Sequence, residues 1–185
     1  MLYHFHEFQR SLMSPFVAFS DAAAKMYSQP SSVLSKLPGA PRVAATYELM
    51  YRIGKDYEKP EFGITSAAVG NVDVAVQQQV ALDKPFCRLL RFKRFTDNPQ
   101  ALAVMKGQPT VLVVAPLSGH HSTLLRDTVK SLLQDHKVFI TDWTDARMVP
   151  ADVGAFHLDD YVTYVQDFIR HIGPEVNVIS VCQPT

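Results

Sequence analysis

The spacing of apolar residues changes along the chain, and the change predicts a helical segment followed by a sheet. Residues 1–60 favour two helices, one over residues 2–27 and a second that opens at Pro41 and ends near Gly54. Pro15 is expected to kink or divide the first helix, because proline cannot donate the backbone bond of a helix interior. The second helix has apolar residues every three to four positions, which predicts one buried stripe. The members of this stripe are Val43, Tyr47, Met50 and Ile53.

Beyond residue 60 the apolar residues first alternate and then form continuous runs. Alternation over residues 72–76 and an extended pattern over residues 86–95, with a break at residues 82–85, predict an antiparallel hairpin. Residues 109–115 form a continuous apolar run, typical of a parallel strand that is buried on both faces. Helices and strands then alternate, at residues 123–133 (helix), 137–143 (strand), 159–171 (helix) and 176–181 (strand).

A hairpin that leads into successive β-α-β units is the way an α/β-hydrolase sheet begins. We therefore expect an α/β fold, namely the N-terminal portion of an α/β-hydrolase sheet preceded by a helical segment. The expected domains are residues 1–60 for the helical segment and residues 61–185 for the hydrolase part. Asp159 is expected to cap the last helix, whose apolar stripe should face the sheet.

Composition narrows the classes of protein to which the chain can belong. Hydrophobic residues make up 47% and charged residues 19% of the sequence, as in ordinary folded proteins. The 18 basic and 18 acidic residues balance, which argues against a nucleic-acid partner. Two cysteines suit a reducing compartment, and the chain opens without the features of a signal peptide. The longest apolar run, residues 111–117, is too short to span a bilayer, so we expect a cytoplasmic protein with no membrane span.

The last predicted strand leads directly into a motif that suggests a nucleophile. An α/β-hydrolase places its nucleophile on a sharp turn after a strand, in the pattern small-x-nucleophile-x-small. Ser180 and Pro184 occupy the two small positions here, and Cys182 occupies the position of the nucleophile. A thiol attacks an ester carbonyl as the thiolate, which a paired base or a helix N-terminus favours. The structural alternative is a buried cysteine at the end of a strand.

A nucleophile of this kind needs two backbone N–H groups to bind the oxyanion. The residue after the nucleophile, here Gln183, supplies one of them, and the loop after the third strand supplies the other. In that loop, residues 115–121, Leu117 or Ser118 would offer the N–H group. Gly119 would let the backbone approach the substrate closely, although serine and glycine are also common in an ordinary turn.

Gly119, His120 and Trp143 could line the pocket. His120 lies in the same loop, and Trp143 ends the strand at residues 137–143, at the sheet edge where such proteins place their sites. Asp145 and Arg147 follow Trp143 and could instead pair only with each other to fix their loop. No metal is expected, because His120 and His121 are adjacent on an extended loop and point apart.

Several motifs together resemble those of the intracellular poly(3-hydroxybutyrate), or polyhydroxyalkanoate, depolymerases of bacteria. The segments that carry the resemblance are residues 115–129, 140–150, 157–162 and 178–184, and also residues 3–10 and 47–51. The resemblance implies a thiol esterase without a cofactor that cleaves 3-hydroxyalkanoate esters, with Cys182 as its nucleophile. It implies as partners the polymer of amorphous storage granules or 3-hydroxyalkanoate oligomers, and a location at the granule surface.

Members of that family are longer, and their catalytic aspartate and histidine lie in a C-terminal half that these residues do not match. We therefore expect residues 1–185 alone to be inactive and to need that half as a partner. Two other functions stay open. One is a polyester synthase-like acyltransferase, although such enzymes have glycines where Ser180 and Pro184 stand. The other is a non-catalytic, granule-associated fragment whose helices within residues 2–54 lie on the polymer.

Overall fold

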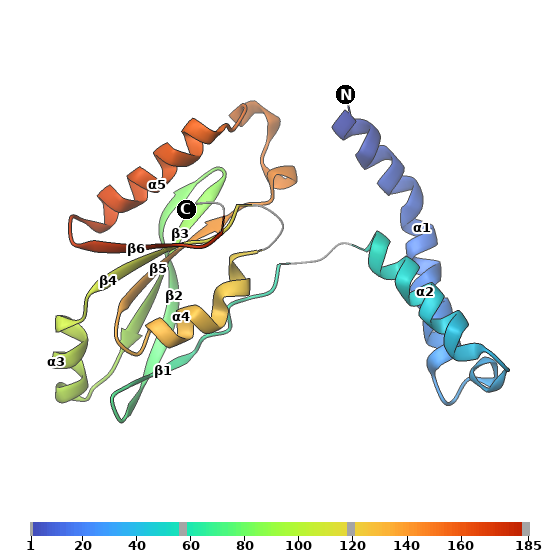
Figure 1. The fold of residues 1–185 in the computed structure, drawn as a ribbon, viewed down its shortest axis with the longest axis horizontal. Coiled ribbons are helices and arrows are strands. Elements are labelled where there is room, and N and C mark those ends of the chain that lie inside the picture. Colours follow the sequence, from blue (N-terminus) through green and yellow to red (C-terminus); the bar gives the residue numbers. More distant parts are fainter. Residues whose placement is uncertain (1, 56–58, 118–120, 183–185) are drawn as a thin grey trace. The chain divides into compact units, whose positions relative to one another are not determined.

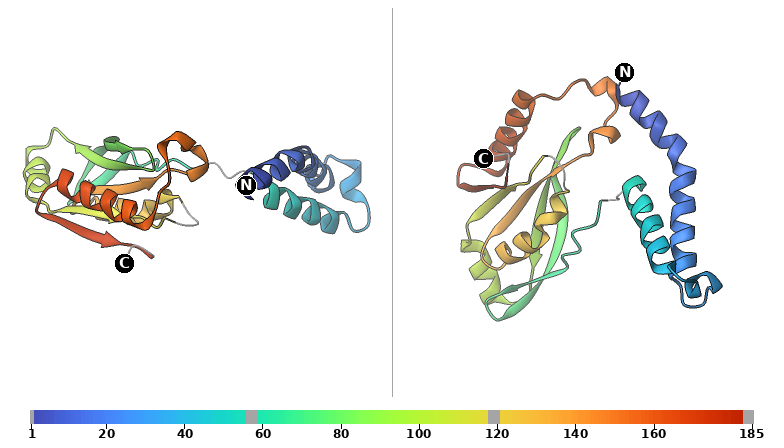
Figure 2. Two further views of the ribbon diagram at one scale, coloured as in Figure 1. Left: turned by 90° about the horizontal axis from the view of Figure 1, so that it is seen from above. Right: turned by 45° about the vertical axis from the view of Figure 1, so that its right-hand side comes forward.

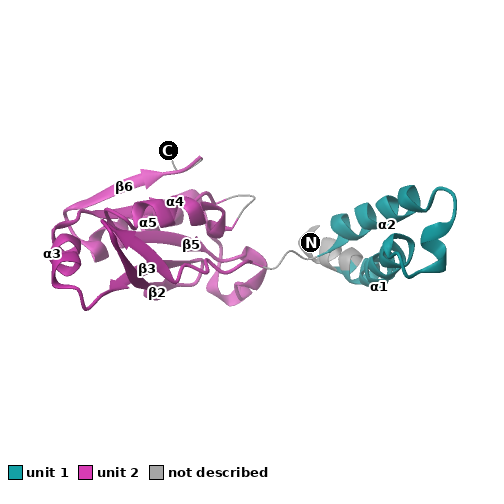
Figure 3. Ribbon diagram, turned by 90° about the horizontal axis from the view of Figure 1, so that it is seen from below, with its two compact units in different colours: residues 1–58 teal, residues 59–185 magenta. Residues whose placement is uncertain are grey.

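The computed structural model describes residues 2–55, 59–117 and 121–182. Contacts within the chain divide it into two compact units, residues 1–58 and residues 59–185 (Figure 3). The first unit is helical and the second contains all the strands of the described residues. No helix in the described ranges is long and apolar enough to cross a membrane.

The first unit is a hairpin of two helices. The helices α1 (Leu2–Ser28) and α2 (Ala40–Gly54) run side by side, and the short 3-10 helix η1 (Val33–Lys36) lies in their connection (Figures 1 and 2). The ring of Tyr47 in α2 contacts Phe19 and Tyr27 in α1, at centroid distances of 5.9 and 6.3 Å. Helix α1 continues through Pro15, so a division into two helices at this residue is wrong.

The predicted stripe of α2 is not the buried surface of this helix, although Tyr47, one of its members, contacts α1. The buried residues of α2 are Ala40 and Ala44. Small side chains at the contact allow two helices to approach closely, and this explains why alanines are buried while larger residues lie outside. The large residues of the predicted stripe are exposed or half-buried: Val43, Tyr47, Met50 and Ile53.

The second unit is built on a six-stranded sheet in the order β1-β2-β3-β5-β4-β6 (Figure 1). Strands β1, β2 and β3 pair antiparallel, and β3 also pairs antiparallel with β5. Strand β4 pairs parallel with β5 on one side and with β6 on the other. The strands are β1 (Ser66–Val69), β2 (Val72–Lys84), β3 (Cys87–Phe95), β4 (Thr110–Val114), β5 (Lys137–Trp143) and β6 (Val176–Ser180).

This arrangement confirms an α/β fold that follows N-terminal helices. The predicted hairpin is β2 and β3, and the predicted parallel strands are β4, β5 and β6. The pattern of apolar residues does not predict β1 or α3 (Pro99–Gly107), because both are too short to show a clear period. Asn98 caps α3, because its side chain accepts from the backbone N–H groups of Gln100 and Ala101.

Helices cover both faces of the sheet. Asp142 and Trp143 are neighbours in β5, so their side chains point to opposite faces. Asp142 bonds Ser122 in the 3-10 helix η2 (Ser122–Leu125), which leads into α4 (Arg126–Leu132). Trp143 stacks on Tyr161 of α5 (Leu158–Ile172), with ring centroids 4.7 Å apart. Helices α4 and α5 therefore lie on opposite faces of the sheet. Right-handed crossovers require this, because α4 connects β4 to β5 in one direction along the sheet and α5 connects β5 to β6 in the other.

Two details of these helices differ from the expectation. Helix α5 begins after His157, whose backbone N–H donates to Asp160 at 2.8 Å, so Asp159 is not the capping residue. The period predicts that Leu124, Val129 and Leu133 share one side of the helix at residues 123–133. That helix opens with η2, which leaves Leu124 exposed while Val129 and Leu133 are buried. A tighter first turn rotates the side chains away from the 3.6-residue period on which the prediction depended.

Phe168 of α5 packs on the sheet with no exposed surface, as the predicted apolar stripe of this helix requires. We predict that Phe168→Ala lowers the free energy of unfolding by about 3–5 kcal/mol, because it leaves a cavity against the sheet. The control is Val162→Ala on an exposed side of the same helix, with an expected change within about 0.5 kcal/mol. Urea denaturation of both variants measures this, and equal losses would show that α5 does not pack as described.

Candidate functional site

The pairing of β4 with β6 brings two distant loops together. The register sets Val114 beside Ser180, the last residues of the two strands. One residue further, the backbone N–H of Val181 donates to the carbonyl oxygen of Val114 at 3.2 Å. The chain after β4, which opens with Ala115, therefore lies beside the chain after β6, which contains Cys182 (Figure 1).

Cys182 has a backbone conformation that amino acids other than glycine seldom adopt. Its φ angle is 68°, and no other non-glycine residue in the described ranges has a positive φ. Such a conformation costs about 1–3 kcal/mol and persists where the surroundings impose it, which is common at active sites. The side chain of Cys182 is exposed, so the alternative of a buried structural cysteine is wrong. The residue thus presents a thiol on a sharp turn directly after a strand.

Part of the predicted oxyanion site can be located. Leu117 is exposed and stands three residues beyond the end of β4, and β4 ends at the same edge of the sheet as β6, which Cys182 follows. The other predicted residues of the site lie outside the described residues: Ser118, Gly119, His120 and Gln183. Their roles stay predictions.

Trp143 is buried and holds the chain where it leaves β4. Its indole Nε1–H donates to the carbonyl oxygen of Ala115 at 3.0 Å. The ring stacks on Tyr161 and lies 6.1 Å from Phe156 between centroids. Trp143 thus belongs to the core below the β4 loop, and its predicted role in lining a pocket stays a prediction.

Asp142 is a buried carboxylate that the sequence analysis did not single out. Only 1% of its surface is exposed, and it accepts hydrogen bonds from Ser122 and from Lys59. Arg88 on β3 donates to its second oxygen at 3.1 Å. A buried charge is tolerated when cations and hydrogen bonds satisfy it, and these three donors do so. The available signal was a lone acidic residue near the end of a predicted strand.

A hollow of about 530 Å³ opens beside this cluster, between the segment after residue 59 and the faces of β2 and β3. Lys59, Arg88 and Asp142 line one part of it, and Phe62 and Ile64 line another. The carboxylate of Asp142 already pairs with both cations. The cluster therefore joins β3, β5 and η2 and leaves no buried charge that requires a ligand.

Asp145 and Arg147 pair with each other, as one of the two alternatives predicted. Arg147 Nη2 lies 2.5 Å from Asp145 Oδ2, and the Asp145 side chain also accepts from the backbone N–H of Arg147. These contacts close the 3-10 turn η3 (Ala146–Met148) after β5. Both residues therefore fix the loop that follows Trp143.

Two other groups that can carry protons are unsuited to the chemistry. Cys87 has no exposed surface, and burial raises the pKa of its thiol, which disfavours the nucleophilic thiolate. Burial also raises the pKa of Tyr161 to about 12, so its phenol stays protonated at neutral pH. Among the described residues no three His, Cys, Asp or Glu side chains lie close enough to hold a metal ion.

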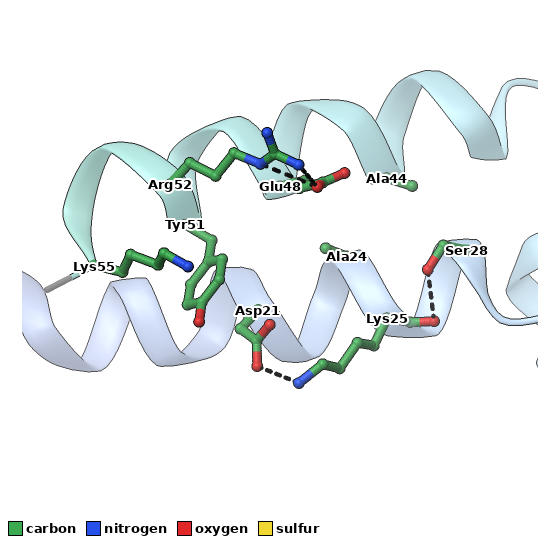
Figure 4. Close-up of a pocket in the computed structure, with 9 residues that line it drawn as sticks. All are labelled: Asp21, Ala24, Lys25, Ser28, Ala44, Glu48, Tyr51, Arg52 and Lys55. Atoms are coloured by element: carbon green, nitrogen blue, oxygen red, sulfur yellow. Dashed lines mark hydrogen bonds and ion pairs between the residues drawn. The ribbon is translucent and has the colours of Figure 1, made fainter. Parts of the chain in front are cut away.

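A second hollow, of about 540 Å³, lies between α1 and α2 (Figure 4). Its charged residues form pairs within each helix, Lys25 with Asp21 at 2.5 Å and Arg52 with Glu48. The ammonium group of Lys55 lies 5.1 Å from the centre of the Tyr51 ring. Exposed pairs of this kind stabilise a helix only slightly and do not indicate a ligand.

The conformation of Cys182 leads to a prediction about stability. Glycine adopts a positive φ without steric cost, so Cys182→Gly should be more stable than Cys182→Ala by about 1 kcal/mol. The matched control is Thr163 in α5, where glycine should be less stable than alanine by about 1 kcal/mol. Denaturation of the four variants, made in the product of the whole reading frame, tests both signs. An alanine variant at position 182 as stable as the glycine variant would contradict the strained turn.

Comparisons of the chain with models of protein families, with curated proteins and with solved structures found no match.

Proposed function

We propose that Cys182 is the nucleophile of a thiol esterase that cleaves the ester bonds of polyhydroxyalkanoates inside the cell. The observation that carries this proposal is the exposed thiol at φ 68°, directly after β6 and beside the chain that leaves β4. A nucleophile on a sharp turn after a strand, next to a loop that can offer N–H groups, is the arrangement by which α/β-hydrolases perform acyl transfer.

The order of the elements supports the same proposal. An antiparallel hairpin, β2 and β3, precedes parallel strands joined by helices on both faces of the sheet. The candidate nucleophile follows the third of these parallel strands, and the candidate oxyanion loop follows the first. Both lie at the carboxyl edge of the parallel strands, where open α/β sheets bind their ligands. We therefore assign the second unit to an α/β-hydrolase sheet within this proposal.

The reaction we propose has two steps. A histidine, which the resemblance locates further along the protein, takes the thiol proton of Cys182 as the sulfur attacks the ester carbonyl carbon, and the oxyanion accepts hydrogen bonds from the backbone N–H of Gln183 and from Leu117 or Ser118. The carbon–oxygen bond breaks, and the leaving alcohol receives that proton from the histidine. Water then gives a proton to the histidine and attacks the thioester, the carbon–sulfur bond breaks, and the histidine returns the proton to the sulfur, so that the 3-hydroxy acid leaves and the thiol of Cys182 is restored.

The resemblance supplies the substrate class. The motifs around Leu117, Arg147 and Cys182 are similar to those of intracellular polyhydroxyalkanoate depolymerases, which act on amorphous storage granules. We accordingly propose a cytoplasmic protein that works at the granule surface on the polymer or on its oligomers. An acyltransferase with the same nucleophile would lengthen the polymer instead of releasing free acid.

The proposal predicts how activity depends on the two cysteines. In the product of the whole reading frame, Cys182→Ala should lower the release of 3-hydroxybutyrate from amorphous granules by roughly 10³-fold or more, because the nucleophile is lost. Cys87→Ala, which changes the buried cysteine, is the control and should retain the rate within about three-fold once the folded fraction is matched. Release of the acid, followed by chromatography, measures both variants.

A Cys182→Ala protein that hydrolyses granules at the parent rate would contradict the proposed nucleophile. Growth of polymer from a 3-hydroxyacyl thioester, without release of free acid, would assign the same cysteine to an acyltransferase.

A further inference from the structure

The last three residues of β5 hold the loop that follows β4 at two points. Strand pairing between β4 and β5 ends at Val113 and Ile140, so Ala115 lies beyond the ladder although it has no exposed surface. Buried backbone groups need hydrogen-bond partners, and here side chains of β5 supply them. The backbone N–H of Ala115 donates to Thr141 Oγ1 at 2.9 Å, and the backbone carbonyl oxygen of Ala115 accepts from Trp143 Nε1–H at 3.0 Å.

The second point lies on the other face of the sheet. The hydroxyl of Ser122 donates to the carboxylate of Asp142, and both residues are buried. Lys59 and Arg88 bind the same carboxylate and fix its position. Ala115 and Ser122 are therefore each bonded by side chains of β5, and the residues that bond them are adjacent in that strand.

We propose that Trp143 and Asp142 are positioning residues for the oxyanion loop, an inference that rests on the proposed function. Leu117, a candidate donor of the oxyanion hole, stands two residues beyond the bonded Ala115 and five before the bonded Ser122. Neither Trp143 nor Asp142 contacts the reacting atoms in this account. Their role is to keep the backbone N–H of Leu117 at a fixed place relative to Cys182, because oxyanion stabilisation depends on donors that are already oriented when charge develops.

The test uses variants that each remove one of the two contacts. Trp143→Phe removes the indole N–H but keeps an aromatic ring against Tyr161, and Ser122→Ala removes the hydroxyl but leaves Asp142 with Lys59 and Arg88. The matched control is Tyr161→Phe, because the Tyr161 hydroxyl is buried and has no hydrogen-bond partner in the described part of the chain. All three are made in the product of the whole reading frame.

A loss of transition-state binding alone lowers kcat and leaves KM unchanged. We expect Trp143→Phe and Ser122→Ala each to lower kcat on a soluble 3-hydroxybutyrate oligomer by about ten-fold, with KM within about two-fold of the parent. Tyr161→Phe should leave both constants unchanged. Hydrogen–deuterium exchange should accelerate in the peptide that carries Ala115 and Leu117 in the first two variants and not in the third.

Three outcomes would overturn the inference, and they differ in what they say of the proposed function. Unchanged kcat in both variants, with hydrolysis that still depends on Cys182, would refute the positioning role and leave the esterase standing. A rise in KM with constant kcat would show that these residues contribute to binding of the substrate and not to stabilisation of the transition state. A parent protein without any hydrolysis that depends on Cys182 would refute both proposals together.

Discussion

The parallel pairing of β4 with β6 determines where chemistry can occur in this protein. Residues 114 and 180 are far apart in sequence, and the register alone makes them neighbours. A shift of one residue would turn every side chain of β6 to the other face and would separate Val181 from Val114. Asn177 adds a side-chain bond to this pairing, because its amide donates to the carbonyl oxygen of Thr110 at 3.2 Å. The candidate nucleophile and the candidate oxyanion loop therefore share one structural cause.

Strand β5 supports this edge of the sheet from both faces. On one face Trp143 joins an aromatic group with Phe156 and Tyr161, and on the other Asp142 sits among two cations and a hydroxyl. A buried carboxylate costs free energy unless its partners are in place, so the Asp142 cluster is sensitive to the arrangement of β3 and η2 around it. The strained backbone at Cys182 likewise persists only while its neighbours impose it. This edge of the sheet thus contains a buried carboxylate and a strained backbone, and the packing of the sheet offsets the free energy that both cost.

Much of the second unit could be predicted from the sequence, because its signals are local. The continuous apolar run before Ala115 gave β4, and the stripe around Phe168 gave the buried face of α5. The Asp142 cluster could not be predicted, since its partners Lys59 and Arg88 are 83 and 54 residues away in sequence. The positive φ of Cys182 could not be predicted from the residue type either, because cysteine disfavours this conformation. Only the small-x-nucleophile-x-small motif indicated a sharp turn at this residue. In the first unit the extent of α2 agrees with the prediction, but its buried residues are the alanines Ala40 and Ala44, which the predicted stripe of larger residues does not contain.

The measurement that tests the central claim most directly is the capture of the acyl-enzyme. The product of the whole reading frame is mixed with a 3-hydroxybutyrate oligomer, quenched in acid within the first turnover and mapped by peptide mass spectrometry. The account predicts a 3-hydroxyacyl group on the peptide that contains Cys182, bound as a thioester that hydroxylamine removes. An acyl group on another residue, or turnover without any acylated peptide, would contradict the account.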